Sequence, residues 1–306
     1  MPSVSSLEQA STILAAAHAD GGRIRIGDDL TTEGLDRILE HETGDLTCTV
    51  EAGVRLSTLN PALGRSGQRL SLDPPGDPTI GSLLARNLSG PLRHRFGAPR
   101  DLVLGVTVVL ADGTVANAGG KVVKNVAGYD LARLVCGSRG RMALIARASF
   151  RLHPVPKAAR SLVVETNDAS SVVALLLRSQ LQPSALDVLH PGRVAVLFEG
   201  SQRAVEAQLA TARDLVGGTE ADSEVWAESR QRQTAAGGRT RFEPGRLGEM
   251  LSKLSEGIVR PAAGLAYTRE EQPSGSEPQG REAGNSVREL VRRIELELDP
   301  RGVFAA

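Results

Sequence analysis

Residues 73–101 read DPPGDPTIGSLLARNLSGPLRHRFGAPRD, and this stretch decides the fold. It is rich in Gly and Pro, yet apolar residues such as Leu83, Leu88 and Phe96 are spread through it. Loops of this length are uncommon inside compact domains, and those that occur are usually binding loops or disordered linkers. The apolar residues argue against a solvated linker. A rigid, turn-rich loop also brings many backbone N–H groups close together, which is one way in which proteins bind phosphate.

The segments around this loop have the composition of strands and short helices. Residues 46–51 and 102–110 are rich in β-branched side chains, and residues 141–152 form a third such run. Apolar residues at helical spacing predict short helices at residues 32–40 and 53–63. This mixture indicates an α+β fold class for the first half of the chain.

A second α+β unit is expected after Pro156, where the composition shifts. Its elements are predicted as strand, helix, strand, strand and helix at residues 161–165, 169–178, 185–189, 193–199 and 202–216. This order gives most of a ferredoxin-like β-α-β-β-α-β unit.

The chain is therefore divided into four predicted parts. Residues 1–156 form the first domain, and residues 157–268 form a cap-type α+β domain. Residues 269–286 (REEQPSGSEPQGREAGNS) have the composition of a disordered linker. Residues 287–306 contain a final amphipathic helix.

Composition limits the possible functions. The 306 residues include 36 Lys and Arg against 36 Asp and Glu. Zero net charge argues against nucleic acid as a partner, because nucleic-acid-binding domains usually carry a basic excess. No apolar run approaches the roughly 20 residues that a transmembrane segment needs, and the N-terminus lacks the features of a signal peptide. We expect a cytoplasmic protein, with peripheral attachment to a membrane through partners left open.

Common catalytic motifs are absent from the sequence. There is no GxGxxG after a strand and no GxxxxGK[ST], which argues against a Rossmann or P-loop site. Cys48, Cys136 and the five scattered histidines lack the spacing of a metal site. No residue stands out as a general base, so the catalytic residues stay unknown. If the chain is an enzyme, a bound cofactor is expected to carry its chemistry.

Three groups of residues together resemble the PCMH-type FAD-binding domain of the vanillyl-alcohol-oxidase superfamily. They are residues 73–75 with 79–81, residues 87–90 with 96–105, and residues 137–140 leading into Ile145. Within this superfamily, the run GGKVVKNVAGYDLARL at residues 119–134 resembles most closely the FAD-binding subunit of bacterial glycolate oxidase.

This resemblance implies two α+β subdomains with FAD bound non-covalently between them, mainly through backbone amides, followed by a ferredoxin-like α+β cap domain. It places at the cofactor Asp73, Pro74, Pro75, Thr79, Ile80, Gly81, Ser82, Asn87, Ser89, Gly90, Gly97, Gly137, Ser138, Gly140 and Ile145. Taken singly, each residue is better explained by a tight turn that needs Gly or Pro for its own geometry. Taken as an ordered set, they favour the flavin fold.

Three arginines of the loop have two interpretations. Arg93, Arg95 and Arg100 can neutralise a phosphate or a carboxylate substrate, or they can be structural. For Arg100 we favour the structural interpretation, in which an ion pair with Asp101 supports the loop.

The chain departs from the family after its first strand. Members of the superfamily carry there a diphosphate-binding loop of the form Pro-Arg-Gly-Gly-Gly-Thr. In this sequence residues 23–26 are followed by Gly27 alone and then by Asp28 and Asp29, whose charges repel a phosphate. Most of the amide donors for the diphosphate are therefore expected to be absent.

Two functional hypotheses follow. In the first, the chain is an FAD-binding oxidoreductase subunit of a glycolate oxidase-like complex. It acts there with a catalytic flavoprotein subunit and an iron–sulfur subunit on a small 2-hydroxy acid such as glycolate. In the second, the chain is a flavin-free structural or assembly subunit of such a complex. We prefer the first, and the presence of a flavin distinguishes the two.

Overall fold

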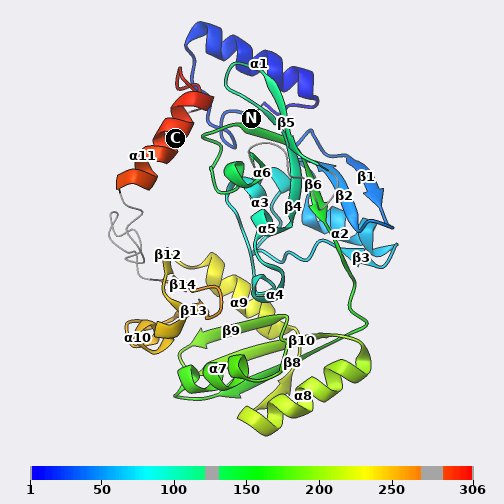
Figure 1. The fold of residues 1–306 in the computed structure, drawn as a ribbon, viewed down its shortest axis with the longest axis vertical. Helices are drawn as coiled ribbons and strands as arrows, with labels where there is room; N and C mark the ends of the chain where they lie inside the picture. The colour runs from blue at the N-terminus through cyan, green and yellow to red at the C-terminus, as the bar shows by residue number, and fades with distance from the viewer. Residues whose placement is uncertain (1, 121–130, 270–284, 305–306) are drawn as a thin grey trace.

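The computed structural model describes residues 2–120, 131–269 and 285–304, which form two α+β bodies stacked along the long axis of the molecule (Figure 1). The first body is at the top of the figure and the second is at the bottom. The chain passes from one to the other between β7 (His153–Pro154) and β8 (Ala158–Glu165). The linker predicted for residues 269–286 lies largely outside the described residues, as does much of the run at residues 119–134.

An antiparallel sheet of five strands, in the order β1-β2-β6-β4-β5, forms the centre of the first body. Its strands are β1 (Ile38–Glu42), β2 (Thr47–Glu51), β4 (Val103–Val109), β5 (Val115–Gly119) and β6 (Leu144–Arg151). The central strand β6 is buried on both faces because cores lie on both sides of the sheet, and its successive side chains point to opposite sides. Leu144 and Ala146 enter one core, and Ile145 enters the other.

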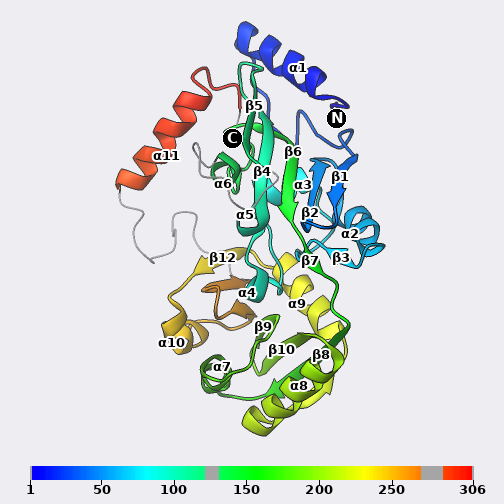
Figure 2. The same ribbon diagram turned by 45° about the vertical axis from the view of Figure 1, so that its right-hand side comes forward.

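Helices cover both faces of this sheet. The larger core is closed by α2 (Leu56–Gly64), α3 (Ile80–Ala85), α5 (Pro99–Leu102) and α6 (Leu131–Val135). The smaller core is closed by α1 (Leu7–Asp20), which begins at the Ser6 N-cap and ends at Gly21. The first body also has two short elements on the side that faces the second body (Figure 2). They are β3 (Gln68–Arg69) and α4 (Arg93–Phe96).

The end of the chain returns to the first body. Helix α11 (Asn285–Leu298) runs up its flank in Figures 1 and 2, and the residues after it enter the core below α1. The Ile24 N–H donates to the Val303 carbonyl at 2.7 Å, and the side chains of Val303 and Phe304 are buried. Asp299 fixes this turn by accepting from the N–H groups of both residues at 2.8 Å.

The second body contains the ferredoxin-like unit. Its elements are β8, α7 (Ala169–Arg178), β9 (Ala185–His190), β10 (Arg193–Gly200), α8 (Gln202–Val216) and β11 (Thr219–Ala221). They form an antiparallel sheet in the order β11-β8-β10-β9, which β13 (Gly257–Arg260), β14 (Leu265–Thr268) and β12 (Gly238–Arg241) extend. The predicted α+β fold is thus confirmed.

The two faces of this second sheet have different covers. One face is covered by helices α7, α8 and α10 (Leu247–Leu251). The short 3-10 helix η1 (Pro244–Arg246) directly precedes α10. Helix α9 (Glu224–Thr234) packs on the other face, at the junction with the first body (Figures 1 and 2). Strand β10 serves both cores, since Val194 and Val196 face α7 and α8 while Ala195 faces α9.

Two local predictions were wrong. The strand expected at residues 23–26 consists only of isolated bridges at Ile24 and Ile26. The predicted helix at residues 32–40 is a turn followed by the edge strand β1. Leu35 and Leu39 have helical spacing, but only Leu35 is buried, and the pairing of residues 38–42 with β2 decides the conformation.

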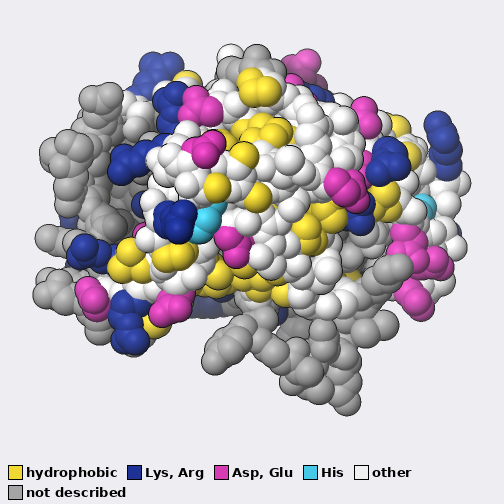
Figure 3. All heavy atoms as spheres, turned by 90° about the horizontal axis from the view of Figure 1, so that it is seen from above, with side chains coloured by type: hydrophobic (Ala, Val, Ile, Leu, Met, Phe, Trp, Pro, Cys, Tyr) yellow, Lys and Arg dark blue, Asp and Glu magenta, His cyan; other side chains and the backbone are white. Residues whose placement is uncertain are grey.

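The surface is mixed in charge. Figure 3 shows acidic and basic side chains interspersed on the face seen from above, without a single dominant patch. In the part of the chain that the structure describes, no helix combines the length and apolar character needed to cross a bilayer.

Candidate functional site

A cavity of about 1200 Å³ opens between the two bodies. The first body lines it with residues 26–33, the start of α3, residues 85–88 and the turn at residues 136–140. The second body lines it with β12 and the start of β14. Pockets for drug-sized ligands usually span about 300–1,000 Å³. This cavity therefore has room for a larger ligand, such as a dinucleotide.

Seven of the fifteen predicted site residues line this cavity. They are Thr79, Gly81, Ser82, Asn87, Gly137, Gly140 and Ile145. They come from two segments more than 40 residues apart in the sequence. The two segments meet because α3 packs against β6 and α6 packs against β4.

The other eight predicted residues do not line the cavity. Ile80 and Pro74 are buried and Pro75 is half-buried, while the Ser138 hydroxyl is buried without a hydrogen-bond partner in the described structure. Gly97 lies against Asp101 at the end of α4. The last three, Asp73, Ser89 and Gly90, belong to the contact between the two bodies, where a Cβ on Gly90 would lie 1.8 Å from the Asp73 carbonyl oxygen.

Two glycines of the cavity wall have different reasons to be glycine. Gly140 has φ +80°, and a Cβ there would lie 2.9 Å from the Cβ of Ile26. Gly137 has φ +88°, but its nearest neighbour would be the Asn87 Cβ at 3.8 Å. Close packing within the protein therefore requires Gly140, whereas Gly137 leaves its free side to the cavity.

The turn at residues 25–30 stands where the family's diphosphate loop is expected, and its amides are already engaged. The N–H of Gly27 donates to the Leu30 carbonyl at 2.8 Å. The N–H groups of Asp28, Asp29 and Leu30 all donate to the Arg25 carbonyl, at 3.2, 2.8 and 3.3 Å. A phosphate would find none of these four donors free.

The amides at the start of α3 are engaged as well. Ile80 and Gly81 donate to the carbonyls of Val54 and Ala52 at 2.8 and 2.7 Å. The Ser82 N–H donates to the Thr79 side-chain oxygen, which caps the helix.

The amides of the turn at residues 137–139 also donate hydrogen bonds within the protein. Gly137 and Arg139 donate to the carbonyls of Leu84 and Ala85 at 3.0 and 2.8 Å, and Ser138 donates within its own turn. The amides of these three turns are therefore all engaged within the protein.

Arginine side chains supply positive charge to the cavity instead. Seven arginines line it, against only two acidic residues, Asp28 and Glu33. Arg55 pairs with Glu33 at 2.7 Å. The other six have no carboxylate partner among the described residues: Arg86, Arg93, Arg100, Arg139, Arg239 and Arg241. This excess of positive charge favours an anionic ligand.

Three of these arginines gather where the second body meets the cavity. Burial lowers the pKa of Arg93, the charges of Tyr267 and Asp101 act in the opposite direction, and those of Arg241 and Arg239 lower it, so two further cations lie close to this guanidinium. The Arg93 guanidinium donates to the Ser89 hydroxyl at 3.0 Å. An anion among these side chains would relieve the repulsion.

The ion pair predicted between Arg100 and Asp101 is not formed. The Asp101 carboxylate instead accepts from the Ala98 N–H at 2.8 Å, which fixes the start of α5. The Arg100 N–H approaches the Asn87 side-chain oxygen at 3.4 Å, and the Arg100 side chain lines the cavity. Arg95 lies elsewhere and contacts the Gln182 carbonyl at 3.4 Å.

Sequence reasoning missed Arg86, Arg139, Arg239 and Arg241. Arg139 belongs to the turn that carried the resemblance, so its place in that turn was a usable signal. Arg239 and Arg241 are on β12, about 100 residues further along the chain, and only the stacking of the two bodies brings them to the cavity.

Two non-glycine residues of the cavity wall have a left-handed backbone. Asn87 has φ 49° and Arg139 has φ 56°. Such conformations are uncommon outside glycine, and they concentrate at functional sites. The two residues are close together, since Arg139 bonds to Ala85 and Gly137 lies beside Asn87.

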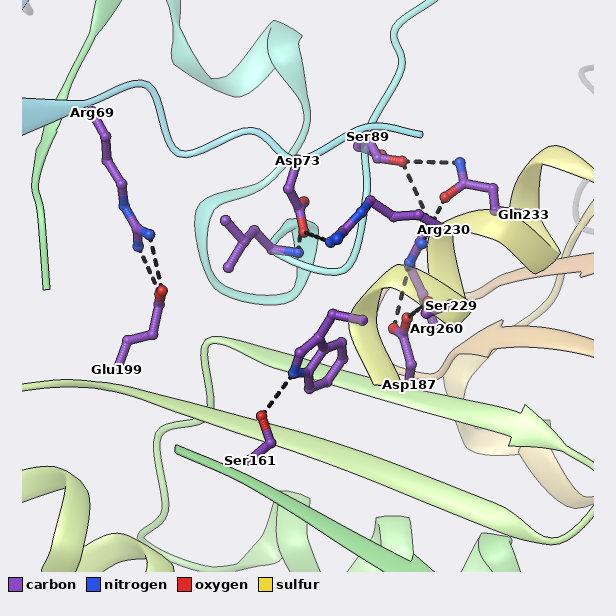
Figure 4. Close-up of polar contacts among 12 residues, drawn as sticks. Arg69, Asp73, Ser89, Ser161, Asp187, Glu199, Ser229, Arg230, Gln233 and Arg260 are labelled. Carbon is purple, nitrogen blue, oxygen red and sulfur yellow. Dashed lines mark hydrogen bonds and ion pairs between the residues drawn. The ribbon is translucent and has the colours of Figure 1, made fainter. Parts of the chain in front are cut away.

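A buried polar network anchors the loop at residues 73–101 to the second body (Figure 4). The Ser89 carbonyl accepts from Gln233 at 3.0 Å and from Arg260 at 3.4 Å. Arg260 also donates to the Gln233 side-chain oxygen at 2.7 Å. Its charge is balanced by Asp187, whose carboxylate lies 3.4 Å away and accepts from the Ser229 hydroxyl at 2.5 Å. The Arg260 Nε and the Asp187 Oδ1 atoms form an ion pair without a hydrogen bond, and the remaining bonds hold the loop against the second body.

Asp73 lies near this network, where its partner Arg230 directly follows Ser229 on α9. Its carboxylate accepts from the Leu92 N–H at 3.0 Å and lies 3.7 Å from the Arg230 guanidinium (Figure 4). Desolvation raises its pKa to about 7, although Arg260 and Arg230 act in the opposite direction.

Asp73 also lines a second cavity of about 680 Å³ beside α9. Trp226 forms part of its wall and donates from its indole to the Ser161 hydroxyl at 2.9 Å. Near this cavity, Arg69 of β3 pairs with Glu199 of β10 through two bonds of 2.9 and 2.6 Å, which joins the two bodies (Figure 4).

Comparisons with known proteins agree on the first body. Residues 25–119 match the family model described as "FAD binding domain". The chain is 34% identical over 219 residues to glycolate oxidase subunit GlcE of Escherichia coli (strain K12), covering 69% of this chain and 61% of that protein.

Two further relatives match shorter parts. Glycolate oxidase subunit GlcD of Bacillus subtilis (strain 168) is 33% identical, over 53% of this chain and 36% of its own length. The mitochondrial D-lactate dehydrogenase [cytochrome] 1 of Saccharomyces cerevisiae (strain ATCC 204508 / S288c) is 30% identical, over 54% of this chain and 29% of its own length. The chain thus spans less than two thirds of each of these relatives.

The fold extends over the whole chain in one solved structure. Alkyldihydroxyacetonephosphate synthase superposes with a TM-score of 0.73, over 99% of this chain and 74% of that protein. The sequence identity is 16%, so this likeness concerns the fold alone.

Proposed function

We propose that this chain, a PCMH-type FAD-binding protein of the vanillyl-alcohol-oxidase superfamily, is the FAD-binding oxidoreductase subunit of a complex that oxidises a small 2-hydroxy acid. The cavity between the two bodies carries this proposal. Residues of the matched domain line it, and its size and positive charge fit FAD, the cofactor of this domain. The similar proteins are named as glycolate oxidase subunits and as a D-lactate dehydrogenase, which supports a hydroxy acid as the substrate.

The residues of the cavity have distinct roles in this proposal. Thr79, Ser82 and Asn87 offer polar side chains to FAD, and Gly137 allows it to approach the backbone. FAD, when bound, accepts the two electrons that leave the hydroxy acid. The group of Arg93, Arg239 and Arg241 would hold the carboxylate of the substrate, because guanidinium groups pair well with carboxylates.

The partners that we propose are a catalytic flavoprotein subunit and an iron–sulfur subunit of a glycolate oxidase-like complex. The similarity to GlcE, which is itself named as a subunit, supports an assembly of this kind. In it, the bound FAD would take electrons from the substrate and the iron–sulfur subunit would carry them away.

A second candidate function is a flavin-free structural or assembly subunit of such a complex. The turn at residues 25–30 favours it, because its four amides are engaged where the family's diphosphate loop is expected. In this case the cavity would hold no redox cofactor.

The visible absorption spectrum of the purified protein tests both functions. FAD is added, the excess is removed, and the spectrum is compared with that of the protein as purified. We expect a retained flavin spectrum that is bleached by glycolate or D-lactate in the absence of oxygen. A protein that stays colourless would contradict the proposed function and favour the assembly subunit. Retained flavin that neither acid bleaches would contradict the proposed substrate alone.

A further inference from the structure

The diphosphate of a ligand in the main cavity needs hydrogen-bond donors, and the amides of three turns in the cavity wall do not provide them. The amides of residues 27–30, 80–82 and 137–139 all donate within the protein. A diphosphate buried without donors is strongly unfavourable. Arginine side chains can supply the donors that these turns lack, and the cations of the cavity wall without an ion-pair partner among the described residues are all arginines.

Three of these arginines start from one small region of the wall. Arg86 directly follows α3, Arg100 is tied through its N–H to the side chain of Asn87, and Arg139 is tied through its N–H to the Ala85 carbonyl. All three are exposed and line the cavity. We call Arg86, Arg100 and Arg139 the arginine triad.

The position of Arg139 relates the triad to the missing loop. The next residue, Gly140, packs against Ile26, which immediately precedes the shortened turn. Arg139 also keeps a left-handed backbone, a conformation that Asn or Gly would adopt more easily. The site thus places a long cationic side chain beside the gap, at some cost in backbone strain.

We propose that the arginine triad binds the diphosphate of FAD through guanidinium groups, in place of the backbone amides of the missing loop. This inference rests on the proposed function, since it concerns the same cavity. Guanidinium groups make two parallel hydrogen bonds to phosphate oxygens and keep their charge at all accessible pH values. Binding through exposed arginines is also screened by salt. FAD affinity should therefore fall with ionic strength, and each triad residue should contribute to that dependence.

The test compares FAD with riboflavin, which has the same ring system and no phosphate. Binding of both is followed by flavin fluorescence at low and high salt for the wild-type protein, Arg86→Gln, Arg100→Gln and Arg139→Asn. Asn is chosen at position 139 because it tolerates the left-handed backbone. Arg203→Gln is the matched control, since Arg203 is exposed on α8 and outside the cavity.

Each triad variant is expected to weaken FAD binding by about 10-fold or more, the usual value of a hydrogen bond to a charged group. Riboflavin affinity and the thermal melting curve should stay the same, and the salt dependence of FAD binding should decrease. Arg139→Lys should restore part of the affinity.

Three results would overturn the triad. If FAD affinity is unchanged in folded variants, or if riboflavin affinity falls equally, the triad does not bind the diphosphate. A wild-type protein that binds neither FAD nor riboflavin would overturn both the triad and the proposed function. Wild-type binding with insensitive variants would overturn the triad alone.

Discussion

Asp73 is a residue whose environment strongly changes its chemistry. Desolvation raises the pKa of its carboxyl from 3.8 to about 7. Between these pH values the folded protein keeps the proton that the unfolded chain releases. The resulting contribution to the free energy of unfolding is complete below about pH 4 and is lost as the pH rises to about 7.

Replacing Asp73 by Asn should therefore flatten the pH dependence of stability. As the pH rises from 4 to 7, the midpoint of urea unfolding of the wild-type protein should fall relative to that of Asp73→Asn, which lacks this titration. Urea titrations at several pH values measure this difference, and Asp36→Asn, at an exposed carboxylate, serves as the control. Parallel pH curves for Asp73→Asn and the wild-type protein would show that the carboxyl titrates normally.

At the scale of an element, Gly81 determines how closely α3 lies on the first sheet. A Cβ on Gly81 would lie 3.1 Å from the Cβ of Ala52 and 3.3 Å from both the Ala52 carbonyl and the Thr32 hydroxyl. Gly81 is therefore needed for packing between α3 and the sheet, whatever the cavity binds.

Gly81→Ala should destabilise the protein by roughly 1–3 kcal/mol, the usual cost of overpacking. Gly64→Ala is the matched control, because Gly64 is also helical but has nothing within 4 Å of its added Cβ. The control should be neutral or stabilising by up to about 1 kcal/mol. Denaturant unfolding measures both changes, and equal stability of the two variants would contradict the packing role of Gly81.

The sequence predicted the elements better than it predicted the site. Strands at residues 46–51, 102–110 and 141–152 were recognisable because their β-branched composition is local information. The glycines and prolines of the loop likewise indicated a binding loop. The cavity also depends on β12, which reaches it only through the stacking of two bodies. No local pattern contains that contact, so Arg239 and Arg241 could not be predicted.

The sequence also could not predict which backbone amides near the cavity already donate hydrogen bonds within the protein. A turn rich in glycine has many N–H groups, but the sequence does not say which carbonyls they meet. The shortened turn after Ile26 was visible, and the bonds that engage its amides were not.

At the scale of the whole molecule, the last residues support the first body. Phe304 is 7% exposed and shares a core with α1, so Phe304→Ala should lower the free energy of unfolding by about 3–5 kcal/mol. Leu296→Ala, at a side chain that is 55% exposed on α11, should change it by less than about 0.5 kcal/mol. Thermal or urea unfolding measures both. A small effect of Phe304→Ala would show that the end of the chain does not support this core.

The return of the chain to the first body has a consequence for synthesis. Domains usually fold in the order in which they leave the ribosome. Here the core beneath α1 lacks Val303 and Phe304 when the first body leaves the ribosome. It stays incomplete until the whole second body has been translated. During that interval the apolar face of α1 lacks part of its cover. We therefore expect the second body to fold before the first is complete.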